Sequence, residues 1–197
     1  MRILGIAGSP RRGGNTDILL AELIRGAASK DAETKIVILG DTDYSTCTHC
    51  DSCLKTGVCI VQDEMQDIFK EFELADIIVL ASPIQFTGIT APMKAMIDRF
   101  QSRWVRKYLL KMPPLGDRRE RKGFFISVGG RKVKDLFEPA LVMMKTFFRI
   151  LDITYTGELL FPGIDEKGAI SQHPEALGQA FLAGQELVGD RLQENNN

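Results

Sequence analysis

Short apolar runs alternate with segments of helical periodicity along the chain, and this alternation constrains the fold more than any other feature. The apolar runs lie at residues 2–8, 34–40, 75–83, 122–130 and 153–161. Segments of helical spacing begin near Thr16, Asp63, Thr90, Pro139 and Pro174. Because apolar strands of this kind need both faces covered, and right-handed crossovers supply the covering helices, the pattern predicts a doubly wound α/β fold.

The predicted sheet is five-stranded and parallel, with the flavodoxin-like order 2-1-3-4-5. We expect a single domain over residues 1–192 and a disordered tail over residues 193–197. The helix that begins near Thr90 is expected to continue to Tyr108, because its apolar residues stay on one side throughout.

Charge and hydropathy exclude several classes of partner. Lys and Arg total 25 against 26 for Asp and Glu, so the formal net charge is −1 and offers no overall field to attract nucleic acid or an anionic membrane. The apolar run at residues 77–81 is far shorter than a membrane span, and residues 1–10 do not resemble a signal peptide. We therefore expect a cytoplasmic protein that binds neither nucleic acid nor membranes.

A loop rich in glycine follows the first apolar run, with the sequence GSPRRGGNT at residues 8–16. Such a loop offers backbone N–H groups and the positive end of a helix dipole to an anion. Ser9, Asn15 and Thr16 add hydroxyl or amide donors, and Arg11 adds charge. It matches neither common nucleotide-binding glycine motif. The loop predicts a phosphate site, although a plain strand-to-helix turn would need the same glycines.

Two further loops follow the third and fourth predicted strands, SPIQFTGIT at residues 82–90 and SVGGRK at residues 127–132. In a sheet of this order, ligands bind where the strand order reverses, between the first and third strands. A planar polar ring at that place can bond backbone groups of Ile84, Gln85, Phe86 and Thr87. Turn geometry alone would explain each glycine and proline separately, but three loops converging on one place favour a ligand site.

All four cysteines of the chain fall within residues 47–59, at Cys47, Cys50, Cys53 and Cys59. In a reducing cytoplasm such a cluster indicates a metal site rather than disulfides. Two successive gaps of two residues direct three sulfurs toward one centre, and Gly57 permits the reversal that brings in the fourth. The spacing favours a [4Fe-4S] cluster. A zinc site and an empty or redox-active thiol cluster are the alternatives.

Three of these motifs together resemble the NADPH-dependent FMN reductase family of flavodoxin-like proteins: GSPRRGGNT, SPIQFTGITAPMKAMIDR and SVGG. The cysteine segment followed by VQDEM resembles the iron-sulfur flavoprotein branch of that family. The resemblance implies FMN and a [4Fe-4S] cluster held by the four cysteines. It implies a phosphate site at Ser9, Arg11, Gly14, Asn15 and Thr16. It implies a flavin-ring site at Pro83, Ile84, Gln85, Phe86, Thr87, Gly129 and Gly130.

These features predict an iron-sulfur flavoprotein, a flavin-dependent oxidoreductase that relays electrons from a low-potential donor such as ferredoxin to a small acceptor such as dioxygen, peroxide or a quinone. FMN exchanges electron pairs for single electrons, whereas a cluster carries one at a time. No residue is assigned as a catalytic acid or base. One alternative is an NAD(P)H-dependent FMN or quinone reductase with structural or unoccupied cysteines, and another is a non-enzymatic electron carrier.

Several charged residues bear on ion pairing within the chain and on binding to other proteins. Asp98 and Arg99 are expected to form an ion pair on a helix surface or at a subunit contact. A basic run is predicted to be either a solvated surface or a landing patch for an acidic ferredoxin. Its members are Arg103, Arg106, Lys107, Lys111, Arg118, Arg119, Arg121 and Lys122. The family resemblance also implies a homodimer or homotetramer.

Overall fold

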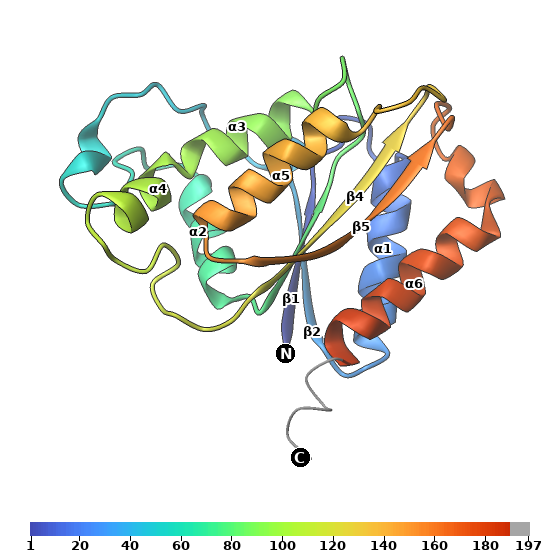
Figure 1. Ribbon diagram of the computed structural model, residues 1–197, viewed down its shortest axis with the longest axis horizontal. Helices are drawn as coiled ribbons and strands as arrows, with labels where there is room; N and C mark the ends of the chain where they lie inside the picture. The colour runs from blue at the N-terminus through green and yellow to red at the C-terminus, as the bar shows by residue number, and fades with distance from the viewer. Residues whose placement is uncertain (190–197) are drawn as a thin grey trace.

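The computed structural model describes residues 1–189, which form a parallel sheet with helices on both faces (Figure 1). The strand order is β2-β1-β3-β4-β5, which confirms the predicted doubly wound, flavodoxin-like fold. The strands are β1 Arg2–Ala7, β2 Glu33–Ile38, β3 Ile77–Ala81, β4 Lys122–Gly129 and β5 Thr154–Pro162. Each begins and ends within two residues of the apolar run that predicts it.

The helices divide between the two faces of the sheet. Helices α1 and α6 cover one face, and α2, α3, α4 and α5 cover the other (Figure 1). Their bounds are α1 Asn15–Ala28, α2 Met65–Leu74, α3 Ala91–Arg99, α4 Gln101–Tyr108, α5 Glu138–Ile150 and α6 Pro174–Gly189.

The central strand β3 shows why the sheet needs both layers. All of its residues are buried. Ile77 and Val79 point into the core beneath α1 and α6, whereas Ile78 and Leu80 point into the core beneath the other helices. Alternate residues of a strand face opposite sides. A strand buried on both sides is therefore apolar at every position, as residues 77–81 are.

The prediction of one continuous helix from Thr90 to Tyr108 is wrong, because the chain breaks at Phe100 into α3 and α4. The Phe100 ring is buried against Phe69, Phe72 and Phe147, with ring centroids 5.0, 4.7 and 5.1 Å away. Phe100 has φ −73° and ψ 4°, outside the regular helical values. Packing of this aromatic cluster accompanies the interruption between the two helices, which periodicity alone does not reveal.

Helices α1 and α6 approach closely through two glycines. A side chain at Gly26 would overlap the carbonyl group of Phe181, and one at Gly184 would overlap the carbonyl group of Leu23. At each contact the glycine of one helix therefore lies against a carbonyl group of the other, where a side chain has no room.

Residues 193–197, for which the sequence predicts a disordered tail, lie outside the described residues. Within residues 1–189, no helix combines the length and the apolar character that crossing a membrane requires.

Candidate functional site

The chain turns from β1 into α1 through a tight loop at residues 8–14. Ser9 Oγ holds the loop: it donates to the Arg11 carbonyl at 3.0 Å and accepts from the Arg11 N–H at 3.1 Å. A Cβ at Gly14 would lie 2.9 Å from the same carbonyl oxygen, so the turn requires glycine there. The N-cap residue Gly14 supplies no side-chain cap to α1, and the Asp17 carboxylate in the first turn accepts from the Gly13 N–H at 3.0 Å. The start of α1 can still offer N–H groups and the positive end of its dipole to an anion.

Thr16 and Asn15 differ in how their side chains are used. Thr16 is 1% exposed, and its Oγ1 has no hydrogen-bond partner among residues 1–189. Buried hydroxyls are nearly always paired, so this one fits an absent acceptor such as a phosphate oxygen. Asn15 instead donates from Nδ2 to the Glu166 carbonyl at 2.9 Å and accepts at Oδ1 from the Ile170 N–H at 3.2 Å. Its side chain anchors residues 166–170 at the edge of the pocket.

Hydrogen bonds join the loops that follow β1, β3 and β4. Thr90 Oγ1 donates to the Gly8 carbonyl at 2.5 Å, and the Gly8 N–H donates to the Ala81 carbonyl at 2.8 Å. The Ile84 N–H donates to the Val128 carbonyl at 2.9 Å. The three loops therefore meet at the carboxyl edge of the sheet, as the predicted strand order requires.

One pocket lies among these loops and gathers most of the predicted FMN-site residues. Those that line it are Ser9, Arg11, Gly14, Asn15, Thr16, Pro83, Ile84, Gln85 and Gly130. Phe86, Thr87 and Gly129 do not line it. Phe86 and Thr87 form the tip of the loop with positive φ values of 47° and 64°, and Phe86 is fully exposed. Which of these residues bind FMN stays a prediction.

Sequence reasoning missed a fourth segment of this pocket, at residues 164–167 after β5. Ile164, Asp165 and Lys167 line the pocket. The segment is held there by the Gly129 carbonyl, which accepts from the N–H groups of Gly163 at 2.6 Å and Ile164 at 3.1 Å. The available signal was the position of the segment after a parallel strand, since all such loops share one edge.

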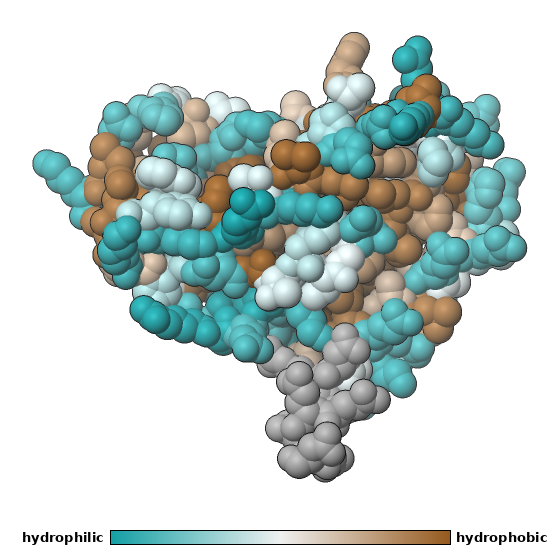
Figure 2. Space-filling view, viewed as in Figure 1, coloured by the Kyte–Doolittle hydropathy of each residue, from teal (hydrophilic) through white to brown (hydrophobic). Residues whose placement is uncertain are grey.

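The cysteine-bearing segment, residues 47–59, lies against α4 (Figure 1). Gly57 has φ +69°, and a side chain there would overlap Arg106 of α4. Arg103 of the same helix donates to the Gly57 carbonyl at 3.3 Å. The segment exposes Leu54 and Val58, the adjoining Ile60 is also exposed, and hydrophobic residues gather at this end of the molecule (Figure 2). Gly57 thus makes the reversal that the sequence predicts, and α4 supplies its support.

All four cysteines line one hollow and remain free thiols. Arg99, Gln101 and Ser102 form the other side of this hollow. Within the described part of the chain, no three of the potential metal ligands are gathered closely enough to hold an ion. The thiols therefore surround a common space without closing on a centre. This donor set fits an iron-sulfur group in chemistry, and His49 also lines the hollow.

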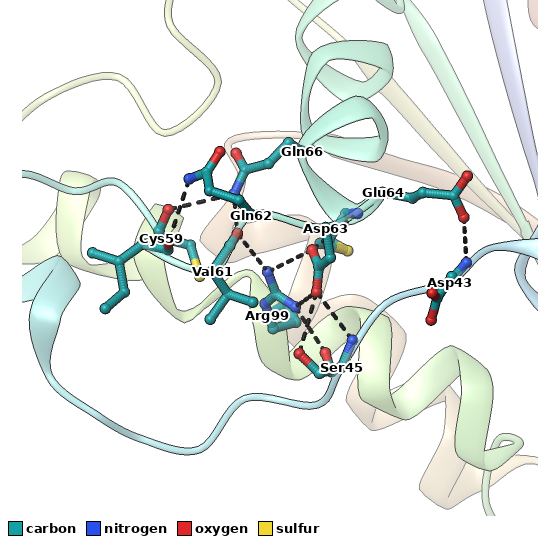
Figure 3. A network of polar contacts seen from close by, with 11 residues as sticks. Asp43, Ser45, Cys59, Val61, Gln62, Asp63, Glu64, Gln66 and Arg99 are labelled. Carbon is teal, nitrogen blue, oxygen red and sulfur yellow. Dashed lines mark hydrogen bonds and ion pairs between the residues drawn. The ribbon is translucent and has the colours of Figure 1, made fainter.

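Arg99, which lines this hollow, forms an ion pair with the half-buried Asp63 (Figure 3). Arg99 is 2% exposed, and it also donates to the Ser45 carbonyl at 2.8 Å. Burial raises the pKa of Asp63, but hydrogen bonds from Arg99 and Ser45 outweigh burial and lower this pKa to about 2. For Arg99, burial lowers the pKa, and the contacts with Asp63 and the Cys59 thiol raise it overall.

The expectation that Arg99 pairs with Asp98 is wrong. Asp98 pairs with Lys94 at 2.6 Å on the surface of α3, whereas Arg99 points inward to Asp63. Adjacent residues on a helix project about 100° apart, so they rarely face one another.

Carboxylates neutralise much of the predicted basic run. Arg103 pairs with Glu73 at 2.8 Å, and Lys107 pairs with Asp152 at 2.6 Å. Arg119 and Arg121 share Asp117, at 2.9 and 2.8 Å. Arg103 and Arg121 are also buried. This run therefore offers less free positive charge to a partner than the sequence suggests.

A parallel sheet of order 2-1-3-4-5, with a pocket at the carboxyl ends of β1 and β3, defines the class of flavodoxin-like proteins. The chain matches the NADPH-dependent FMN reductase family over residues 1–152. It belongs to this family and, by its relatives, to the iron-sulfur flavoprotein branch. The family resemblance seen in the sequence is thereby confirmed.

Two relatives support this assignment, and one solved structure supports the fold. An iron-sulfur flavoprotein of Archaeoglobus fulgidus is 32% identical over 146 residues, which are 74% of this chain and 70% of that protein. An iron-sulfur flavoprotein of Methanocaldococcus jannaschii is 37% identical over 99 residues, 50% of this chain and 51% of that protein. The structure of a flavone reductase superposes with a TM-score of 0.76 at 20% identity, covering 100% of this chain and 65% of that one.

The chain spans only about half the length of some curated relatives, such as the 51% of the M. jannaschii protein. The similarity therefore establishes the family and the fold, but neither the electron donor nor the acceptor.

Proposed function

We propose that the chain is an iron-sulfur flavoprotein that passes electrons from a low-potential donor of the ferredoxin kind to a small acceptor such as dioxygen, peroxide or a quinone. The observation that carries this proposal is the hollow lined by four free thiols in a protein whose sheet edge also forms an anion pocket. The names of the relatives support the same combination of groups.

The sheet-edge pocket fits FMN by its chemistry. The orphaned Thr16 hydroxyl and the uncapped start of α1 offer neutral donors to a phosphate, and Arg11 and Lys167 offer positive charge. Pro83, Ile84 and Gln85 would contact the flavin ring from the β3 loop. FMN supplies the exchange of electron pairs for single electrons, while these residues bind it and orient it.

The second hollow fits a [4Fe-4S] cluster, with Cys47, Cys50, Cys53 and Cys59 as its ligands. A cluster supplies one-electron transfer at a low potential. The segment carrying the ligands packs at Gly57 against Arg106 of α4 and accepts a hydrogen bond there from Arg103, so α4 supports these ligands. The two hollows share no lining residue, so each site is built independently.

The test is the composition of the protein purified without oxygen. Iron, acid-labile sulfide and FMN are measured per chain, together with the visible spectrum. About four irons, four sulfides and one FMN are expected, with broad absorbance that fades on reduction. A protein that holds FMN but takes up neither iron nor sulfide after anaerobic reconstitution would contradict the proposal.

An NAD(P)H-dependent FMN or quinone reductase with structural or unoccupied cysteines is a second candidate, because the family that the chain matches is NADPH-dependent. Rapid bleaching of bound flavin by NADPH in an iron-free preparation would favour this function. Reversible redox changes without turnover of any small acceptor would favour the carrier function instead.

The partner predictions are tested separately. Light scattering of the purified protein distinguishes a homodimer or homotetramer from a monomer. The rate of reduction by ferredoxin at low and high salt tests for electrostatic steering, since complementary charge accelerates encounter mainly at low salt. A rate independent of salt would contradict a charged docking surface.

A further inference from the structure

Two buried donors without partners face the cysteine hollow from the helical side. Arg99 is 2% exposed and Ser102 is 1% exposed, and both line the hollow together with the four cysteines. Arg99 Nε and Ser102 Oγ have no hydrogen-bond partner among residues 1–189. Buried polar groups are nearly always satisfied, so two such donors on one wall indicate an acceptor between them and the thiols.

The remaining donors of Arg99 are already engaged. Nη1 donates to Asp63 Oδ2 at 2.7 Å, and Nη2 donates to Asp63 Oδ1 at 3.0 Å (Figure 3). These bonds fix the plane of the guanidinium and compensate most of its charge. What Arg99 still offers the hollow is one oriented N–H group rather than a free cation.

Ser102 takes its position from the helix break described above. Phe100 separates α3 from α4, and Ser102 lies in the first turn of α4. The break therefore lets residues from both helices line the same hollow.

We propose that Arg99 and Ser102 donate hydrogen bonds, from Nε and Oγ, to sulfur atoms of the iron-sulfur group and raise its reduction potential. The inference rests on the proposed function, because it assumes that the four cysteines hold such a group. Reduction adds one negative charge to a cluster, so a donor to sulfur stabilises the reduced form more than the oxidised form. Hydrogen bonds to sulfur are one of the means by which proteins set these potentials.

The test is an anaerobic redox titration of the reconstituted protein, with the cluster followed by electron paramagnetic resonance and FMN by absorbance. Ser102→Ala removes one donor and leaves the helix intact. Arg99→Lys keeps a positive charge beside Asp63 but removes the N–H group at the Nε position. Arg149→Lys, an exposed arginine on α5, is the matched control.

At a fixed solution potential, the ratio of reduced to oxidised cluster should fall about tenfold in Arg99→Lys, which is about 59 mV for a one-electron couple. In Ser102→Ala it should fall about threefold, since the serine hydroxyl is a neutral donor. The FMN midpoint should not move in either variant, and Arg149→Lys should match the unsubstituted protein in both midpoints.

The outcomes separate this inference from the proposed function. Full iron and sulfide content with an unchanged cluster midpoint in Ser102→Ala and Arg99→Lys would overturn the inference and leave the proposed function intact. A protein that assembles no cluster overturns both. If Arg99→Lys fails to fold, the cluster midpoint of Ser102→Ala alone tests the inference. This variant should fold, because the hydroxyl that it removes has no hydrogen-bond partner among the described residues.

Discussion

Arg99 and Asp63 form a two-pronged ion pair beneath the cysteine segment, with Nη1–Oδ2 and Nη2–Oδ1 distances of 2.7 and 3.0 Å. The pair joins α3 to the start of α2 across 36 residues of chain. Arg99 is buried, and Asp63 is the carboxylate that compensates its charge. The same ion pair therefore stabilises the fold and holds Arg99 in place on the wall of the cysteine hollow.

Asp63→Asn should lower the free energy of unfolding by about 3 kcal/mol at pH 7, since removing one partner of a buried pair leaves the other charge uncompensated. Urea unfolding followed by circular dichroism measures the change. Asp67→Asn is the control, because Asp67 makes an exposed pair with Lys70 and its loss should change little. Equal effects of the two substitutions would contradict the assigned role of Asp63.

The same pair predicts a loss of stability in acid. The pKa of Asp63 is about 2 in the folded protein, against an ordinary value of 3.8. A carboxylate whose pKa is lower in the folded than in the unfolded protein stabilises the fold. This stabilisation is complete above the unfolded-state pKa and is lost as pH falls through the folded-state pKa. The difference in unfolding free energy between the unsubstituted protein and Asp63→Asn should therefore shrink between about pH 4 and pH 2. A difference that stays constant over this range would count against the pair.

Thr16→Val should weaken FMN binding about tenfold, because it removes a donor to an ionised phosphate while keeping the shape of the side chain. The stability of the FMN-free protein should be unchanged or raised, since the Thr16 hydroxyl has no partner among the described residues. Quenching of flavin fluorescence measures the dissociation constant. Thr34→Val on the exposed face of β2 is the matched control and should leave FMN affinity unaltered.

Gly57→Ala should lower cluster content, because the added Cβ overlaps Arg106 and displaces the cysteine segment from α4. Gly116→Ala carries the same left-handed backbone penalty, with φ +86°, but its Cβ would meet no atom within 4 Å. Iron and sulfide per chain should therefore fall in Gly57→Ala and stay normal in Gly116→Ala. FMN content should be equal in both, because neither glycine lines the sheet-edge pocket.

Gly184→Ala should destabilise the protein by about 2 kcal/mol or more, because its Cβ would force α6 away from the Leu23 carbonyl group on α1. Gly178→Ala, in the same helix, meets no atom within 4 Å. This control should stabilise the protein by about 0.5–1 kcal/mol through helix propensity. The two substitutions should therefore shift the thermal midpoint in opposite directions, and a shift in the same direction would contradict the close approach of α1 and α6.

The sequence by itself determined the sheet and most of its helices, because burial on both faces imposes a continuous apolar run on strands such as residues 77–81. It also determined which loops meet, since parallel strands end at a common edge. The loops carrying Ser9, Thr16 and Pro83 do line one pocket. The spacing of Cys47, Cys50, Cys53 and Cys59 placed the four thiols around one hollow.

Only the tertiary structure decided the break at Phe100 and the pairing of Arg99 with Asp63. It also decided that Asn15 anchors residues 166–170 and that Lys167 lines the sheet-edge pocket. Each depends on contacts between residues far apart in the chain. Periodicity and local spacing report which side of an element is buried, and they carry no information about which distant group lies against it.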